Sequence, residues 1–114
     1  DVSFISLLLI FPVVKRLLQS NGQAVALVKP QFEAGRDQVG KGGIVRDSRT
    51  HRAVLEKIAR YAIEQAWCVR GIGRSPIAGA DGNIEFFIYL SAAATPASID
   101  IDIEKEIERV VIER

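Results

Sequence analysis

The hydrophobic positions of the chain fall into blocks whose spacing predicts a set of strands and helices. A short apolar run ends in Lys29 and predicts a strand over residues 23–29. Because this run does not alternate with polar residues, we expect both of its faces to be covered, as in a parallel sheet between helices. Aromatic and β-branched residues predict further strands over residues 67–72 and 84–93.

Three other blocks show helical spacing. Residues 6–20 are densely apolar, and Pro12 should kink this helix or mark its start. A clear apolar stripe runs along residues 48–66, where Asp47 or Ser48 can cap the helix. The acid-rich tail predicts an amphipathic helix from about residue 103. Residues 30–47 contain four glycines and indicate a long loop, a length typical of functional or mobile segments.

This succession of helices and strands indicates an α/β fold. The short, turn-rich connection between residues 67–72 and 84–93 favours an antiparallel pair. We expect one domain over residues 1–94 and an additional helical tail over residues 95–114.

Composition narrows the class of protein without indicating its activity. The chain has 114 residues and a net charge of +1, so any basic patch for nucleic acid must be local. Its single cysteine excludes an internal disulfide and fits the reducing cytoplasm. No apolar run reaches the roughly 20 residues that a membrane helix needs, and we expect no membrane partner. The chain begins at Asp1 in core-like sequence, so we expect it to be a piece of a longer protein.

Several common kinds of active site have no support in the sequence. His51 is the only histidine, and its place at a helix start predicts a solvated or capping residue. No nucleophile set can be built around it, and no Cys/His cluster predicts a metal site. We expect Cys68 to be a small core residue. Residues 35–41 nearly match a phosphate-binding loop, but Gly42 stands where a serine or threonine would hold Mg²⁺. A flexible basic loop that meets a phosphate backbone fits better, and a solvated glycine-rich loop is the plain alternative.

Acids and a lysine near strand ends are the strongest candidates for chemistry. Asp1 closes one predicted strand, Lys29 closes the next, and Glu85 lies near the start of the third. If the third strand runs antiparallel to its neighbours, these side chains meet at one edge of the sheet. Carboxylates favour the charged form of a lysine and burial favours the neutral amine, a balance that can tune a proton acceptor for a hydroxyl. Spacing alone favours a structural ion pair over catalysis.

Five segments carry a further signal: residues 1–7 (DVSFISL), 28–33 (VKPQFE), 40–47 (GKGGIVRD), 75–77 (SPI) and 82–86 (GNIEF). In this order they resemble the FtsJ-like ribosomal RNA methyltransferases, and most of all the subgroup often labelled hemolysin A. The resemblance implies a partial Rossmann-like, S-adenosylmethionine-dependent methyltransferase fold with a mixed sheet, of which residues 1–94 form the C-terminal half. It also implies that the last strand is antiparallel and lies between the other two.

The resemblance implies an activity as well. Members of that family transfer a methyl group from S-adenosylmethionine to a ribose 2′-hydroxyl of ribosomal RNA, using a Lys-Asp-Lys-Glu set. The resemblance places the aspartate on Asp1, the second lysine on Lys29 and the glutamate on Glu85. Lys29 would activate the hydroxyl, while Asp1 and Glu85 would hold the lysine and set its charge. The first lysine of the set has no counterpart in this chain.

Partners follow from the same resemblance. Phosphates of ribosomal RNA would be held by basic residues of the long loop and the following helix, namely Arg36, Lys41, Arg46 and Arg49. Of the cofactor site the chain keeps Asp1 and Ser3. The glycine-rich loop that binds S-adenosylmethionine in the family and its RNA-binding S4 domain are both missing, so we expect the isolated chain to be inactive.

The missing half has a structural consequence and leaves alternatives. It would expose one edge of the sheet, and because exposed edges pair, we expect a homo-oligomer through that edge. A non-catalytic RNA- or protein-binding module, docking through the tail helix or the sheet edge, is the alternative function. The hemolysin label suggests cytolysis, but the sequence has no membrane-length segment, no signal peptide and no extended amphipathic β repeat.

Overall fold

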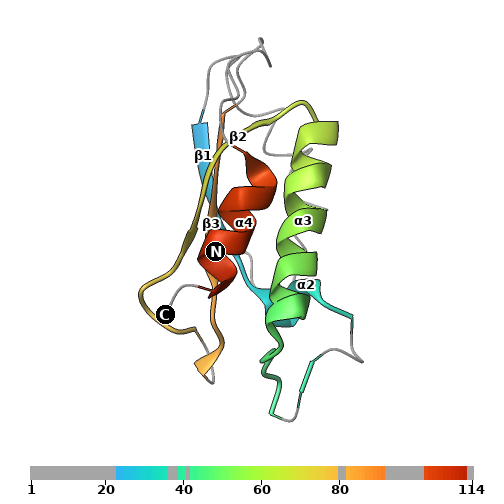
Figure 1. Cartoon of the computed structure of the whole chain (residues 1–114), viewed down its shortest axis with the longest axis vertical. Coiled ribbons are helices and arrows are strands. Elements are labelled where there is room, and N and C mark those ends of the chain that lie inside the picture. Colours follow the sequence, from blue (N-terminus) through green and yellow to red (C-terminus); the bar gives the residue numbers. More distant parts are fainter. Residues whose placement is uncertain (1–22, 36–38, 41, 80–81, 92–101, 113–114) are drawn as a thin grey trace.

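The computed structural model describes residues 23–35, 39–40, 42–79, 82–91 and 102–112, and these residues form an α/β fold (Figure 1). Along the chain the elements are β1 (Gln23–Val28), α2 (Pro30–Glu33), α3 (Ser48–Glu64), β2 (Cys68–Arg74), β3 (Phe86–Ser91) and α4 (Ile103–Ile112). The helix expected over residues 6–20 lies outside the described residues.

The described strands form one sheet in the order β1–β3–β2. In one pair Val28 of β1 lies opposite Phe86, and in the other Arg74 of β2 lies opposite the same residue. Because β1 and β2 each run antiparallel to β3, they point in the same direction. This order confirms the prediction of an antiparallel last strand between the other two. β2 ends two residues later than the predicted range of 67–72, after a register shift between Val69 and Gly71.

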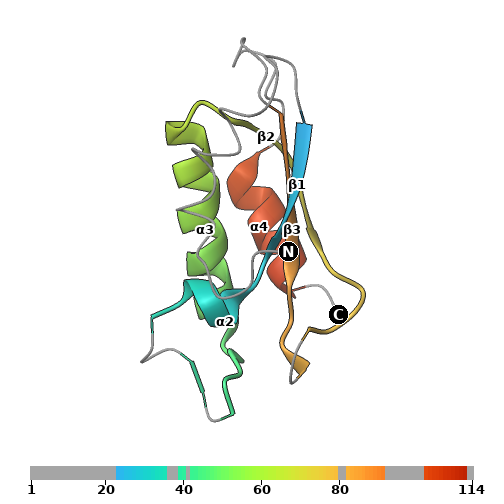
Figure 2. The ribbon, with the colours of Figure 1, turned by 180° about the vertical axis from the view of Figure 1, so that it is seen from behind.

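One face of the sheet and two helices enclose the core. The inward side chains of β3, Phe86, Ile88 and Leu90, are at most 1% exposed. They belong to one cluster with Val54, Leu55, Ile58, Ala59 and Ala62 of α3 and with Ile107, Val110 and Val111 of α4. Figures 1 and 2 show both helices lying along the same side of the sheet. The apolar stripes that predicted these helices are therefore the faces that pack, and burying each large side chain contributes about 1.5–3 kcal/mol.

The helix bounds follow from local chemistry. Asp47 caps α3, since its carboxylate accepts a 2.8 Å hydrogen bond from the backbone N–H of Arg49. α3 and α4 begin at the predicted residues, 48 and 103. The prediction of a loop over the whole of residues 30–47 is wrong at its start. Pro30 opens the short helix α2, because proline suits the first helical turn, where its missing N–H would have no partner.

Two arginines tie α4 to β2. Arg74 donates hydrogen bonds of 3.0 and 2.6 Å to the carbonyl oxygens of Val110 and Val111, in the last turn of α4. Arg109 reaches back from α4 to the carbonyl oxygen of Ile72 at 3.1 Å. The final carbonyls of a helix have no partner within the helix and carry its negative dipole end, so a guanidinium there is favourable.

The opposite face of the sheet is not covered by the described residues. Val25 and Leu27 of β1 are 63% and 37% exposed, and Tyr89 of β3 is 36% exposed. The prediction that both faces of β1 are covered stays a prediction, because the helix expected over residues 6–20 lies outside the part of the chain that the structure describes. There β1 behaves as a strand with one packed face, and its Val28 is fully buried. None of the described helices is long and apolar enough to cross a membrane.

Candidate functional site

Lys29 and Glu85 lie at the same end of two adjacent strands. Lys29 directly follows Val28, the last residue of β1, and Glu85 directly precedes Phe86, the first residue of β3. Val28 and Phe86 are partners in the antiparallel ladder, so the register places Lys29 and Glu85 side by side just beyond it. The third member of the predicted set, Asp1, lies outside the described residues.

Glu85 is held in a confined environment. It is 5% exposed, and its Oε2 accepts a 3.1 Å hydrogen bond from Nε2 of Gln31. Its backbone carbonyl accepts a 2.9 Å hydrogen bond from the N–H of Ser75. Gly79 packs so closely that a Cβ at that position would overlap the carboxylate. The carboxylate is therefore fixed in direction by one amide and by a glycine that leaves room for it.

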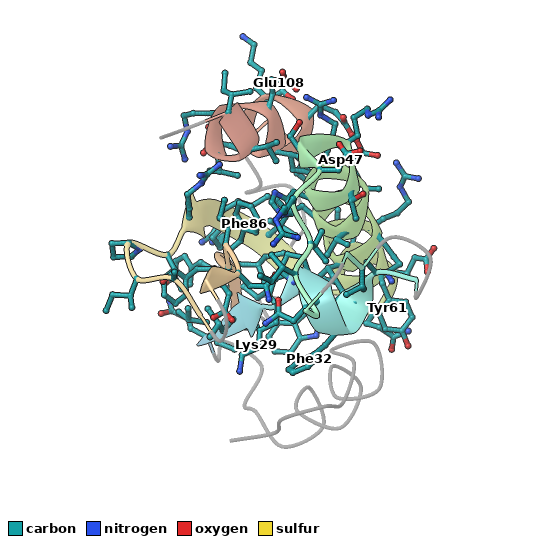
Figure 3. The ribbon with its side chains drawn as sticks, turned by 90° about the horizontal axis from the view of Figure 1, so that it is seen from below. Lys29, Phe32, Asp47, Tyr61, Phe86 and Glu108 are labelled. Atoms are coloured by element: carbon teal, nitrogen blue, oxygen red, sulfur yellow. The ribbon has the colours of Figure 1, made fainter. Side chains whose placement is uncertain are left out.

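Lys29 is half-buried and joins β1 to α2. Its backbone carbonyl accepts hydrogen bonds of 2.9 and 3.2 Å from the N–H groups of Phe32 and Glu33, so it acts as the N-cap residue of α2. Its ammonium lies 5.7 Å from the ring centroid of Phe32, within cation–π range. Figure 3 shows Lys29 and Phe32 at one side of the molecule, opposite Glu108 of α4.

No ion pair joins Lys29 to Glu85 or to any other described carboxylate. The described residues thus do not show the structural ion pair between Lys29 and Glu85 that spacing alone favoured. Instead, the uncharged side-chain amide of Gln31 donates a hydrogen bond to the Glu85 carboxylate. The second polar atom of that amide, Oε1, is buried and has no hydrogen-bond partner among the described residues. An unsatisfied acceptor on the amide that holds this carboxylate suits a site that receives a donor from a substrate.

Of the basic residues predicted to bind RNA, the structure describes Arg46 and Arg49. Arg46 is exposed at the end of the glycine-rich loop, just before α3. Arg49 forms an exposed ion pair with Asp47 at 3.2 Å, which raises the pKa of Arg49 and lowers that of Asp47 through their hydrogen bonds. Part of its charge is therefore already neutralised. Arg36 and Lys41 lie outside the described residues, as does Ser3 of the cofactor assignment.

A family model described as FtsJ-like methyltransferase matches residues 1–92. The chain belongs to the FtsJ-like methyltransferase family. This confirms the resemblance found in the sequence, and with it the expected fold class. The match ends just after β3, so α4 lies beyond it.

Individual relatives are similar to the chain over nearly its whole length. A Bacillus subtilis protein named "Putative rRNA methyltransferase YqxC" is 48% identical over 99% of the chain, and the match covers 40% of that protein. The "16S/23S rRNA (cytidine-2'-O)-methyltransferase TlyA" of Mycobacterium tuberculosis is 36% identical over 99% of the chain and 42% of its own length. The chain thus spans about two fifths of these relatives.

A solved structure gives the same result for the fold. A "Putative hemolysin from Streptococcus thermophilus" superposes with a TM-score of 0.88 at 49% sequence identity, covering 97% of this chain and 39% of that one. "Hemolysin A" of Brachyspira hyodysenteriae is 40% identical over 78% of the chain and 37% of its own length. The subgroup label inferred from the sequence motifs is therefore the name that several relatives carry.

The prediction for His51 is wrong. His51 is neither solvated nor a cap: it is 2% exposed, its Nε2 donates a 3.0 Å hydrogen bond to the carbonyl oxygen of Val45, and its ring meets Phe86 edge to face. Burial lowers the pKa of His51 below 6.5. The sequence held the signal, since His51 precedes Val54, Leu55 and Ile58 at helical spacing and so shares their apolar face.

Two further polar residues contribute to the site but were not predicted from the sequence, although both lie within the family motifs. Gln31 lies in VKPQFE and Asn83 in GNIEF, and each makes contacts to distant parts of the chain. Cys68 is buried, as expected. The described residues contain no group of three or more His, Cys, Asp or Glu side chains that could hold a metal ion.

Proposed function

We propose that this chain supplies the lysine–glutamate half of an rRNA ribose 2′-O-methyltransferase that uses S-adenosylmethionine. The observation that supports this most is the placement of Lys29 and Glu85 side by side at the ends of β1 and β3. Membership of the FtsJ-like family supports methyl transfer. The relatives named as rRNA (cytidine-2'-O)-methyltransferases support an RNA ribose as the acceptor.

When bound, S-adenosylmethionine would supply the methyl group. The ribose 2′-oxygen would form its new bond to the methyl carbon while the bond from that carbon to sulfur breaks, and the hydroxyl proton would pass to Nζ of Lys29. Glu85, oriented by Gln31, and Asp1 would keep the lysine directed at the hydroxyl. Much of the acceleration should come from this alignment of the two reactants.

RNA phosphates would be met by the basic loop. Arg46 is exposed and lines a hollow with Arg74, the last residue of β2, and Arg36, Lys41 and Arg49 complete the proposed set. Such contacts position a nucleic acid without reading its sequence. The same proposal includes Asp1 and Ser3 as cofactor contacts, a cytoplasmic location, self-association through the truncated edge of the sheet, and no methylation by the isolated chain.

The test is a lysine substitution in the full-length protein that contains this chain. Lys29→Ala should lower kcat for methylation of ribosomal RNA by about 10²-fold or more, the usual scale for loss of a proton-transfer group. The free energy of unfolding should change little. Lys105→Ala is the matched control, since Lys105 is exposed on α4 and away from Lys29.

The opposite pattern would overturn the proposal. If Lys29→Ala keeps full methylation but destabilises the fold, the lysine is structural. If the unaltered full-length protein binds ribosomal RNA but transfers no radiolabelled methyl group, the chain belongs to a non-catalytic binding module instead.

A further inference from the structure

The glycine-rich loop before α3, within residues 30–47, is anchored in the core through Val45. Val45 is 2% exposed. Its N–H donates a 2.9 Å hydrogen bond to Oδ1 of Asn83, and its carbonyl oxygen accepts the 3.0 Å hydrogen bond from His51. Both bonds are buried. One side chain from the following helix, His51, and one from a distant part of the chain, Asn83, therefore hold the two polar groups of a single loop residue.

Asn83 holds the loop at a second point as well. Its Nδ2 donates a 3.0 Å hydrogen bond to the carbonyl oxygen of Gly43, while its own carbonyl oxygen accepts a 2.8 Å bond from the N–H of Gly79. The Asn83 side-chain amide thus accepts a hydrogen bond from the Val45 N–H and donates one to the Gly43 carbonyl oxygen, as a neighbouring strand would. Asn83 is 2% exposed and stands two residues before Glu85, so the segment that carries the carboxylate also holds the loop.

The loop itself is tightly built between these points. The N–H of Gly40 donates a 2.7 Å hydrogen bond to the carbonyl oxygen of Ile44, and Gly42 and Gly43 have φ values of +79° and +78°. Glycine takes such backbone angles without steric cost. A Cβ on Gly40 would lie 2.8 Å from the Ile44 oxygen and 3.2 Å from Nη1 of Arg46. The backbone turn therefore fixes the loop from which the exposed Arg46 side chain extends.

We propose that Asn83 is a positioning residue for RNA, which fixes Arg46 and its loop relative to Glu85 so that a bound phosphate sets the place of the reacting ribose. This rests on the proposed methyltransferase function. Asn83 does not touch the reacting atoms; it sets the distance between the surface that holds the RNA backbone and the end of the sheet that carries Lys29 and Glu85. A fixed distance between these two places aligns one ribose with the lysine.

The test uses Asn83→Ala in the full-length protein. The two amide bonds are lost, and the buried N–H of Val45 and the carbonyl oxygen of Gly43 lose their partner, so KM for ribosomal RNA should rise roughly ten-fold while kcat at saturating RNA falls less. The amide hydrogen of Val45 should exchange faster, while exchange within α3 stays unchanged. Ser91→Ala is the matched control, since this buried hydroxyl at the far end of β3 has no hydrogen-bond partner among the described residues.

A second variant keeps the test decisive if Asn83→Ala does not fold. Gly40→Ala leaves the Asn83 side chain intact but pushes the loop from its other side, and KM for RNA should rise in the same way. Unchanged KM and unchanged RNA affinity in a folded variant, or a fall confined to kcat, would overturn the role of Asn83. Absence of methylation by the unaltered protein would overturn the proposed function instead, and the change in RNA affinity and in Val45 exchange would still report on Asn83.

Discussion

Gln31 and Glu85 stand 54 residues apart in the chain and are joined by a 3.1 Å hydrogen bond. The amide comes from α2, directly after the end of β1, and the carboxylate from the residue before β3. A neutral donor therefore orients the buried carboxylate without cancelling its charge. In the proposed site, Glu85 would then direct Lys29.

We expect Gln31→Leu to lower kcat for RNA methylation by about ten-fold, because hydrogen bonds to a charged group contribute roughly 1.5–3 kcal/mol and this one directs Glu85. KM for RNA should change little. Steady-state methylation by the full-length protein measures both constants. Gln23→Leu, at the exposed start of β1, is the control. Equal kcat values in the two variants would show that the amide is not needed to orient Glu85.

Gly79 is predicted to be intolerant of any side chain. Gly79→Ala would place a methyl group where the Glu85 carboxylate lies, so the carboxylate must turn away or the loop must shift. We expect a loss of methylation of about ten-fold or more, together with a destabilisation of roughly 1–3 kcal/mol from overpacking. Gly71→Ala is the control, because a Cβ there meets nothing within 4 Å. Full activity in Gly79→Ala would show that the position of Glu85 is not critical.

The pH dependence of stability should carry a contribution from His51. Burial and the nearby charge of Arg74 lower its pKa, while the hydrogen bond to Val45 and the charge of Asp47 oppose the shift. As pH falls below the unfolded value of 6.5, the unfolded chain binds a proton that the folded chain does not, so the free energy of unfolding decreases. Above that value this contribution is fully present.

Denaturant unfolding between about pH 5 and about pH 8 measures this effect. His51→Gln keeps an N–H donor for Val45 but does not titrate, so it should flatten the slope below pH 6.5. The same slope in this variant would assign the pH dependence to other groups.

Arg74 is predicted to stabilise the docking of α4. Its guanidinium bonds two carbonyl oxygens at the end of that helix and lies 5.7 Å from the ring centroid of Phe86. Arg74→Met keeps most of the side-chain volume but loses these contacts, and we expect a destabilisation of about 2 kcal/mol. Denaturant unfolding measures it, with the exposed Arg60→Met as control. A change below about 0.5 kcal/mol, the usual range of surface substitutions, would contradict this role.

Much of the fold could be predicted because local patterns were strong. The apolar stripe of residues 48–66 and the amphipathic tail each predicted a helix that is present. The β-branched and aromatic runs predicted the strands. Periodicity could not give the order β1–β3–β2, because strand order depends on contacts between segments far apart in sequence. That order came from the family motifs, and the structure confirms it.

For the site, the sequence by itself determined the family, because the motifs that contain Lys29 and Glu85 carry the resemblance that the family model confirms. The catalytic roles of these two residues stay a prediction. Only the tertiary structure decided what surrounds them. Gln31 on Glu85 and Asn83 on the glycine-rich loop are pairings between segments that meet only when the sheet forms. His51 became a buried donor for the same reason: a helix start is exposed or buried according to what packs against it, and that is a property of the whole fold.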